Sequence, residues 1–154
     1  MENFLALLED SALATHLRSA RWEYAAVSAG HIFGIALLIG AILPLDLRLL
    51  GFWSTVERRT IARVLVPVAA SGLLVAVGTG LLLLSVRAQE YASLTVLKVK
   101  LLLILIGILS AFVTHLRHGL WLDRSPSRSL AGVGVLSLAV WICALACGRL
   151  IAFV

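Results

Sequence analysis

The residue in this sequence that most clearly could take part in chemistry is a single histidine inside an apolar segment. His31 lies about nine residues into the segment 22–45, which has one charge near its start and little polarity afterwards. An ionisable group at that depth in a membrane helix is costly and tends to face a partner, a pathway or a cofactor. Gly30 and Gly34 leave room beside the imidazole for a flat macrocycle. His31 is therefore a candidate haem ligand, and an interhelical hydrogen bond to Thr79 or to a carbonyl is the alternative.

The other polar residues of the apolar segments fall at two depths. At about 1.5 Å per residue, His31 lies roughly 12–14 Å from the side that holds both termini, here called the outer side. The outer set comprises His31, Thr79, Lys98, Lys100, Cys143 and Cys147. The inner set comprises Asp46, Arg48, His115 and His118. A charged cluster that fixes helix ends at the water boundary explains the inner set, because polar groups cost little there. The outer set is the stronger candidate for a functional site.

Cations of both sets are candidates for binding the anionic groups of a cofactor. Lys98 and Lys100 could pair with a propionate, or could extend to the lipid headgroups. Arg48 is a further candidate for anionic groups, and His115 completes the set of candidate cofactor-binding residues.

The two cysteines permit a different cofactor. Cys143 and Cys147 are four residues apart in one apolar segment and, with His31, could bind a soft metal such as Cu(I). Cysteine is also common as a small buried hydrophobic residue. A copper site is therefore the alternative to haem.

Four apolar segments must position these side chains. The chain has 154 residues, of which 61% are hydrophobic, against roughly 45–50% in soluble domains. A spanning helix needs about 20 apolar residues, and such segments occur at about 22–45, 61–86, 94–115 and 130–154. We expect an all-α fold: residues 1–154 form a single integral membrane domain, a four-helix bundle, with residues 1–20 as an N-terminal interfacial amphipathic helix.

Charge and motifs exclude several classes of function. The net charge of +5 comes from basic residues near helix ends, where they meet lipid, so nucleic acid is not an expected partner. No Ser–His–Asp arrangement, phosphate loop, HExxH motif or intramembrane carboxylate pair occurs, which disfavours hydrolytic enzymes. The arginine excess beside the two inner loops predicts that the termini lie on the periplasmic side of a bacterial inner membrane.

The order of several short motifs resembles known membrane families. The run His31-Ile-Phe-Gly34, continued by Asp46-Leu-Arg48, is followed by Gly78-Thr79-Gly80-Leu81 and Lys100-Leu-Leu. Over roughly residues 22–118 the chain resembles an uncharacterised family of small bacterial four-helix membrane proteins, the HemJ-type protoporphyrinogen oxidases and, more loosely, the CopD-type copper-resistance domains. The HemJ resemblance implies haem b, with functional roles for His31 and for Lys100, or Lys98 in its place. The histidine that often follows the lysine is replaced here by Ala111.

Residues and resemblance together predict a haem b-binding membrane redox protein that passes electrons to a quinone or a partner protein. His31 is the expected iron ligand, and the second axial ligand is open. A membrane oxidoreductase of the protoporphyrinogen-oxidase type is one form of this function. A copper-handling membrane protein and a cofactor-free accessory subunit are the alternatives, and a homo-oligomer is compatible with each.

Overall fold

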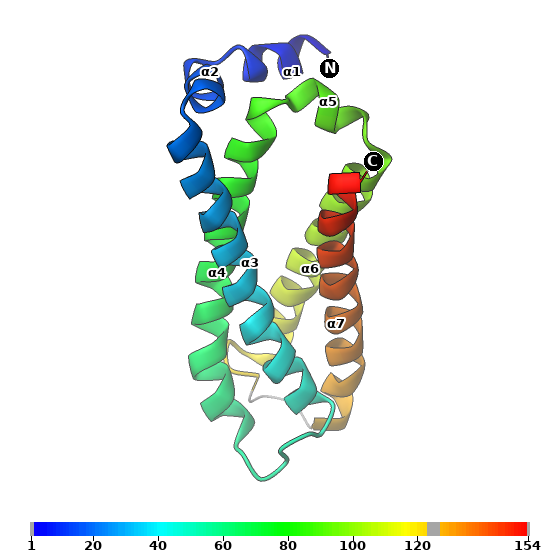
Figure 1. Cartoon of the computed structure of the whole chain (residues 1–154). Coiled ribbons are helices and arrows are strands. Elements are labelled where there is room, and N and C mark those ends of the chain that lie inside the picture. The colour runs from blue at the N-terminus through cyan, green and yellow to red at the C-terminus, as the bar shows by residue number, and fades with distance from the viewer. Residues whose placement is uncertain (1, 123–126, 154) are drawn as a thin grey trace.

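The architecture is a bundle of membrane-length helices (Figure 1). The computed structural model describes residues 2–122 and 127–153. Within these residues four helices are long and apolar enough to cross a membrane. They are α3 (Arg21–Leu49), α4 (Arg58–Val86), α6 (Thr95–His118) and α7 (Ser127–Leu150). Large apolar side chains cover the helix faces that point away from the bundle, with Leu74 75% and Ile32 66% exposed, as lipid contact requires. The prediction of an all-α, multi-pass membrane bundle is therefore confirmed.

Each spanning helix differs from its predicted apolar segment by a few residues, mainly at the end that holds the loops. Helix α3 continues past residue 45 to Leu49, and α6 continues past His115 to His118. A count of apolar residues stops at the first polar ones, whereas the backbone hydrogen bonds of a helix continue through them. Asp46 and Arg48 are consequently helical residues rather than loop residues.

The outer end carries three short helices where one was expected. The predicted helix over residues 1–20 is divided into α1 (Glu2–Glu9) and α2 (Ala12–Ser19), and α5 (Ala88–Ser93) was not predicted. The break follows from the Ser11 side chain, which accepts a hydrogen bond from the Ala14 amide at 3.3 Å and so caps a new helix. Helix α1 packs on α5 and α2 packs on α4, and together they lie across the outer end (Figure 1).

The α3–α4 pair is the closest contact in the bundle because glycines face each other across it. A Cβ atom placed on Gly72 would lie 2.6 Å from the Leu38 amide nitrogen. One placed on Gly34 would lie 2.6 Å from the Ala76 nitrogen. Both obstacles are backbone atoms, so only glycine permits this approach. The small-residue spacing in this segment therefore has a packing role, and it fixes the level at which residues 31 and 79 meet.

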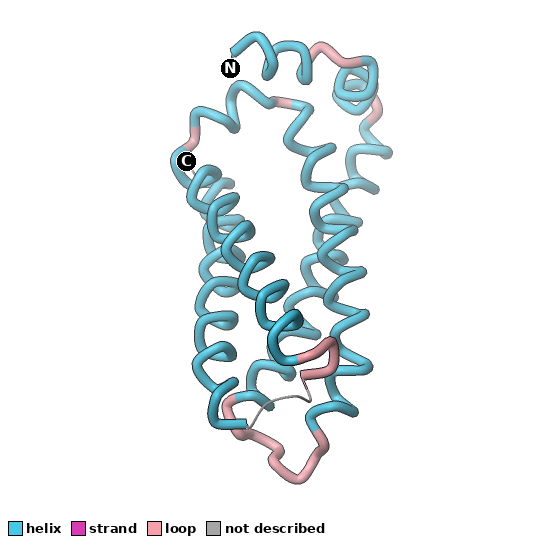
Figure 2. Tube along the Cα trace, turned by 180° about the vertical axis from the view of Figure 1, so that it is seen from behind, coloured by secondary structure: helices cyan, strands magenta, loops and turns pink. Residues whose placement is uncertain are grey.

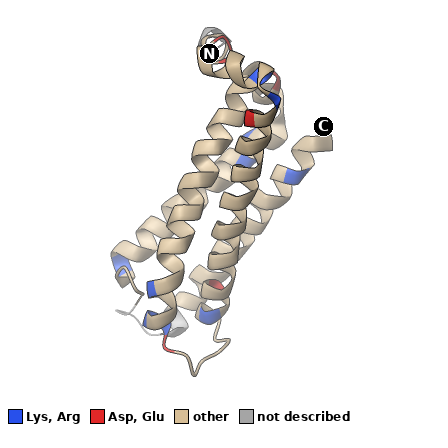
Figure 3. Cartoon of the chain, turned by 60° about the vertical axis from the view of Figure 1, so that its left-hand side comes forward, with Lys and Arg blue, Asp and Glu red and all other residues tan. Residues whose placement is uncertain are grey.

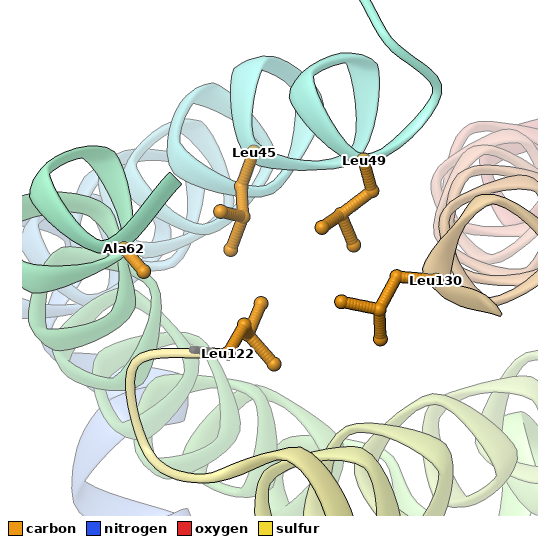
Figure 4. Packing of buried hydrophobic residues seen from close by; sticks show 5 residues of the cluster. All are labelled: Leu45, Leu49, Ala62, Leu122 and Leu130. Carbon is orange, nitrogen blue, oxygen red and sulfur yellow. The ribbon is translucent and has the colours of Figure 1, made fainter. Parts of the chain in front are cut away.

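The four helices form two pairs joined at the inner end. Helix α3 packs on α4 and on α7, and α6 packs on α7. Seen from behind, the pairs converge at the loop end and separate toward the end with both termini (Figure 2). A cluster of buried apolar residues joins them at the loop end (Figure 4): Leu45, Leu49, Ala62, Leu122 and Leu130. This cluster anchors the bundle at its inner end and leaves the outer half to pairwise contacts.

Candidate functional site

His31 lies between α3 and α4, in the outer half of the bundle. Its Nδ1 atom is 2.9 Å from the Ala76 carbonyl oxygen and 3.2 Å from the Thr79 hydroxyl. Gly80 faces the ring, because a Cβ atom there would lie 3.0 Å from His31 Cε1. The imidazole is half-buried. The contact to Thr79 or to a carbonyl that was expected as the alternative to a ligand role is thus present, and it involves one ring nitrogen only.

These contacts fix the tautomer of His31. A carbonyl oxygen can only accept, so Nδ1 must carry the ring proton. The Thr79 hydroxyl donates its own hydrogen to the Val75 carbonyl at 2.6 Å, so it too can only accept from the imidazole. The hydrogen bonds of His31 within the described residues all involve Nδ1, so in the neutral imidazole Nε2 carries the lone pair. Histidines that bind metals have this arrangement, with one nitrogen held by a carbonyl and the other presented to the metal.

Lys100 brings a positive charge to this level from the other helix pair. Its Nζ atom lies 3.2 Å from the position that a Cβ atom on Gly148 would take. The Lys100 side chain therefore packs on the surface of α7 where Gly148 has no side chain. It is half-buried and close enough for its charge to act on His31. His31 and Lys100 thus share one electrostatic environment, although they come from α3 and α6. Lys98, by contrast, is exposed on α6.

The cysteines do not join His31 in a compact group. Cys143 is exposed on α7, and Cys147 is half-buried near Lys100. Within the described ranges no three His, Cys, Asp or Glu side chains lie close enough together to hold a metal ion. The donor set at this level is therefore one imidazole with a nearby ammonium group.

Arg48 lies at the inner end, far from His31. Its Nε donates to the Val56 carbonyl at 2.8 Å and its guanidinium donates to the Ser54 carbonyl at 3.2 Å. These bonds hold the loop that follows α3, as expected for a charge that fixes a helix end. His31 and Arg48 are seventeen positions apart on α3, about 25 Å at 1.5 Å per residue, so the two side chains serve different regions.

Two further residues of the inner set, Asp46 and His115, line a cavity of about 200 Å³ among the four spanning helices, and His118 does not line it. Asp46 and His115 both face it, and each has a buried atom, Oδ2 and Nδ1 respectively, without a hydrogen-bond partner among the described residues. Asp46 is only 4% exposed. Ser137 of α7 is placed to donate to its carboxylate. The expectation of a simple interfacial cluster therefore describes Arg48 but not Asp46 and His115. The sequence had no signal for Ser137, because an isolated serine in an apolar helix is common.

Comparison with known proteins gives no information on function, which must therefore be inferred from the residues of the site. No family model, no curated protein and no solved structure matches the chain.

Proposed function

We propose that the chain is a haem b-binding membrane redox protein in which His31 Nε2 is the iron ligand. The observation that carries the proposal is the fixed tautomer of His31. Its Nδ1–H donates to the Ala76 carbonyl, so Nε2 is left as a neutral lone-pair donor at membrane depth. Bound haem would supply a one-electron iron couple, through which electrons pass to a quinone or a partner protein.

The neighbouring residues fit this role by size and charge. Gly80 has no side chain to collide with the His31 ring, and Gly30 has only the Thr79 methyl group near it. The Lys100 ammonium group would offset the negative charge of a propionate in a region of low dielectric. His115 and Arg48 lie at the other end of the bundle and have no part in this site.

The proposal is tested by the absorbance spectrum of protein purified in detergent after expression with ample haem supply. We expect a Soret band that shifts on reduction with dithionite. His31→Ala should abolish it, and His115→Ala, a matched change at the inner end, should leave most of it. Because the described residues place no second histidine beside His31, the reduced haem should also bind carbon monoxide.

Three results would count against this function. A colourless protein would contradict haem binding, and copper in that colourless sample would favour the copper-handling alternative. A colourless protein without metal would favour a cofactor-free accessory subunit. Equal loss of haem in the two histidine variants would show that the separation into outer and inner sets is wrong.

A further inference from the structure

The inner cavity has features that the haem proposal does not use. It is lined by residues from α3, α4, α6 and α7, and most of them are apolar, among them Leu38, Leu73, Ile108 and Trp141. Its polar groups come from α3 through Asp46, from α6 through Ser110, Thr114 and His115, and from α7 through Ser137. The cavity therefore offers an apolar volume with polar groups suited to binding a ligand that has both kinds of surface.

Two unsatisfied atoms define what such a ligand must supply. A buried carboxylate oxygen without a partner is costly, and in native structures such an atom calls for an explanation such as a bound group. Asp46 Oδ2 accepts hydrogen bonds when the carboxylate is ionised, so it requires a donor. His115 Nδ1 can donate or accept according to its tautomer. Arg48 does not neutralise Asp46 in this structure, because its guanidinium is bonded to loop carbonyls.

The volume limits the ligand further. A cavity of about 150 Å³ accommodates a benzene ring, so 200 Å³ accommodates a six-membered ring with a few substituent atoms. The ligand must also dissolve in the bilayer, because the cavity lies among membrane-spanning helices. A ring with a hydroxyl or carbonyl at its polar positions meets the requirements of volume, polarity and solubility.

We infer that this cavity binds the ring of a lipid-soluble quinone or hydroquinone, with Asp46 and His115 as its polar contacts. The hydroquinone hydroxyl donates to Asp46 Oδ2, and the opposite oxygen meets His115 Nδ1. The inference deepens the proposed function and rests on it for its redox meaning. Asp46 and His31 are fifteen positions apart on α3, about 22 Å at 1.5 Å per residue, so the ring site and the haem site are distinct.

The test is binding of a short-tailed ubiquinol analogue, kept in its reduced form so that it carries the hydroxyl donor, to the haem-free protein, measured by quenching of tryptophan fluorescence. Trp141 lines the cavity and is 6% exposed, so a bound hydroquinone ring should quench it saturably. An alkylbenzene with the same tail competes for the apolar surface without the ring oxygens. We expect saturable quenching that the alkylbenzene does not displace.

Substitutions of residues that line the cavity test which side chains bind the ring. Asp46→Asn and His115→Gln should each weaken binding about tenfold or more, because Asn lacks the charge that strengthens the hydrogen bond to the carboxylate and Gln has no polar atom at the position of the imidazole Nδ1. Ser137→Ala should weaken it less. Ser71→Ala is the matched control, since Ser71 is exposed on α4 and donates to the Val68 carbonyl of its own helix. If Asp46→Asn does not fold, His115→Gln carries the test alone.

The results separate this inference from the haem proposal. Absence of saturable quenching, displacement by the alkylbenzene, or unchanged affinity in both variants would overturn the ring site and indicate water or an acyl chain in the cavity. Protein that binds haem but no quinone analogue would overturn this inference alone. Colourless protein that binds the analogue, with His31→Ala unchanged, would overturn the haem proposal alone.

Discussion

At the scale of single residues, the hydrogen bond to the Ala76 carbonyl has two consequences for His31. It ties α3 to α4, and it also orients the ring and leaves Nε2 available as a ligand. A structural role and a ligand role therefore coexist in one side chain, since they use different nitrogens. The two interpretations that the sequence left open are thus compatible.

Lys100 is the residue whose role a single substitution resolves. Lys100→Met keeps the length of the side chain and removes its charge. If Lys100 pairs with a propionate, that anion is left without its partner at membrane depth, and haem binding should weaken about tenfold or more. Haem titration of the variant and its midpoint potential provide the measurement.

Lys98→Met is the matched control for this change. Lys98 is two residues away on the same helix and therefore on a different face of it, so its substitution should leave both the affinity and the potential unchanged. Equal behaviour of the two lysine variants would indicate that Lys100 extends to the headgroups and does not serve the cofactor.

The sequence predicted individual candidate residues better than their partners. Helical rise alone placed His31 and Lys100 at one level and His115 at another. It could not show that Arg48 would turn to the loop carbonyls, because that depends on the path of residues 51–57. Nor could it identify Ser137 as a partner of Asp46, since rotation of α7 about its axis is set by packing and not by periodicity.

At the scale of elements, the close approach of α3 and α4 controls the position of His31. Gly72→Ala would place a methyl group against the Leu38 backbone, which cannot move without displacing α3. Overpacking of this kind costs about 1–3 kcal/mol. We expect a lower unfolding temperature in detergent, together with weaker haem binding, because the Ala76 carbonyl would move away from Nδ1.

The same helix offers a control for this prediction. A Cβ atom added to Gly78 would have nothing within 4 Å of it, so Gly78→Ala should leave the unfolding temperature unchanged or raise it slightly. If the two variants unfold alike, the α3–α4 contact is looser than the structure indicates.

The prediction of helices was accurate for the spanning helices, which hydropathy alone identifies, and less accurate for the short helices at the outer end. Long apolar segments are enough to predict four spanning helices. The division of residues 1–20 into α1 and α2 depends on one serine cap, and α5 depends on docking against α1. Glu9 strengthens that docking, because its carboxylate accepts from the Gln89 amide at 3.1 Å and also pairs with Arg18. Contacts between segments eighty residues apart cannot be inferred from local pattern.

At the scale of the whole molecule, charge is distributed unequally between the two ends (Figure 3). Among the described residues, the inner end holds Arg48, Arg58, Arg59, Arg63, Arg117 and Arg128. Arg124, which the sequence places on the same side, lies outside the described residues. The outer end holds Arg18, Arg21, Arg87 and Arg149, with Lys98 and Lys100 deeper in α6. Both termini lie at the outer end (Figure 1).

We propose that the protein lies in a bacterial inner membrane, and this asymmetry predicts its orientation there. Positive residues in short loops remain in the cytoplasm, so we expect the loops that follow α3 and α6 in the cytoplasm and both termini in the periplasm. Alkaline phosphatase fused to the C-terminus should then be active, because it folds only after export, whereas green fluorescent protein at the same position should be dark. The reverse pair of results would place the termini in the cytoplasm. His31 would then lie in the cytoplasmic half of the membrane, and the cavity at Asp46 would lie in the periplasmic half.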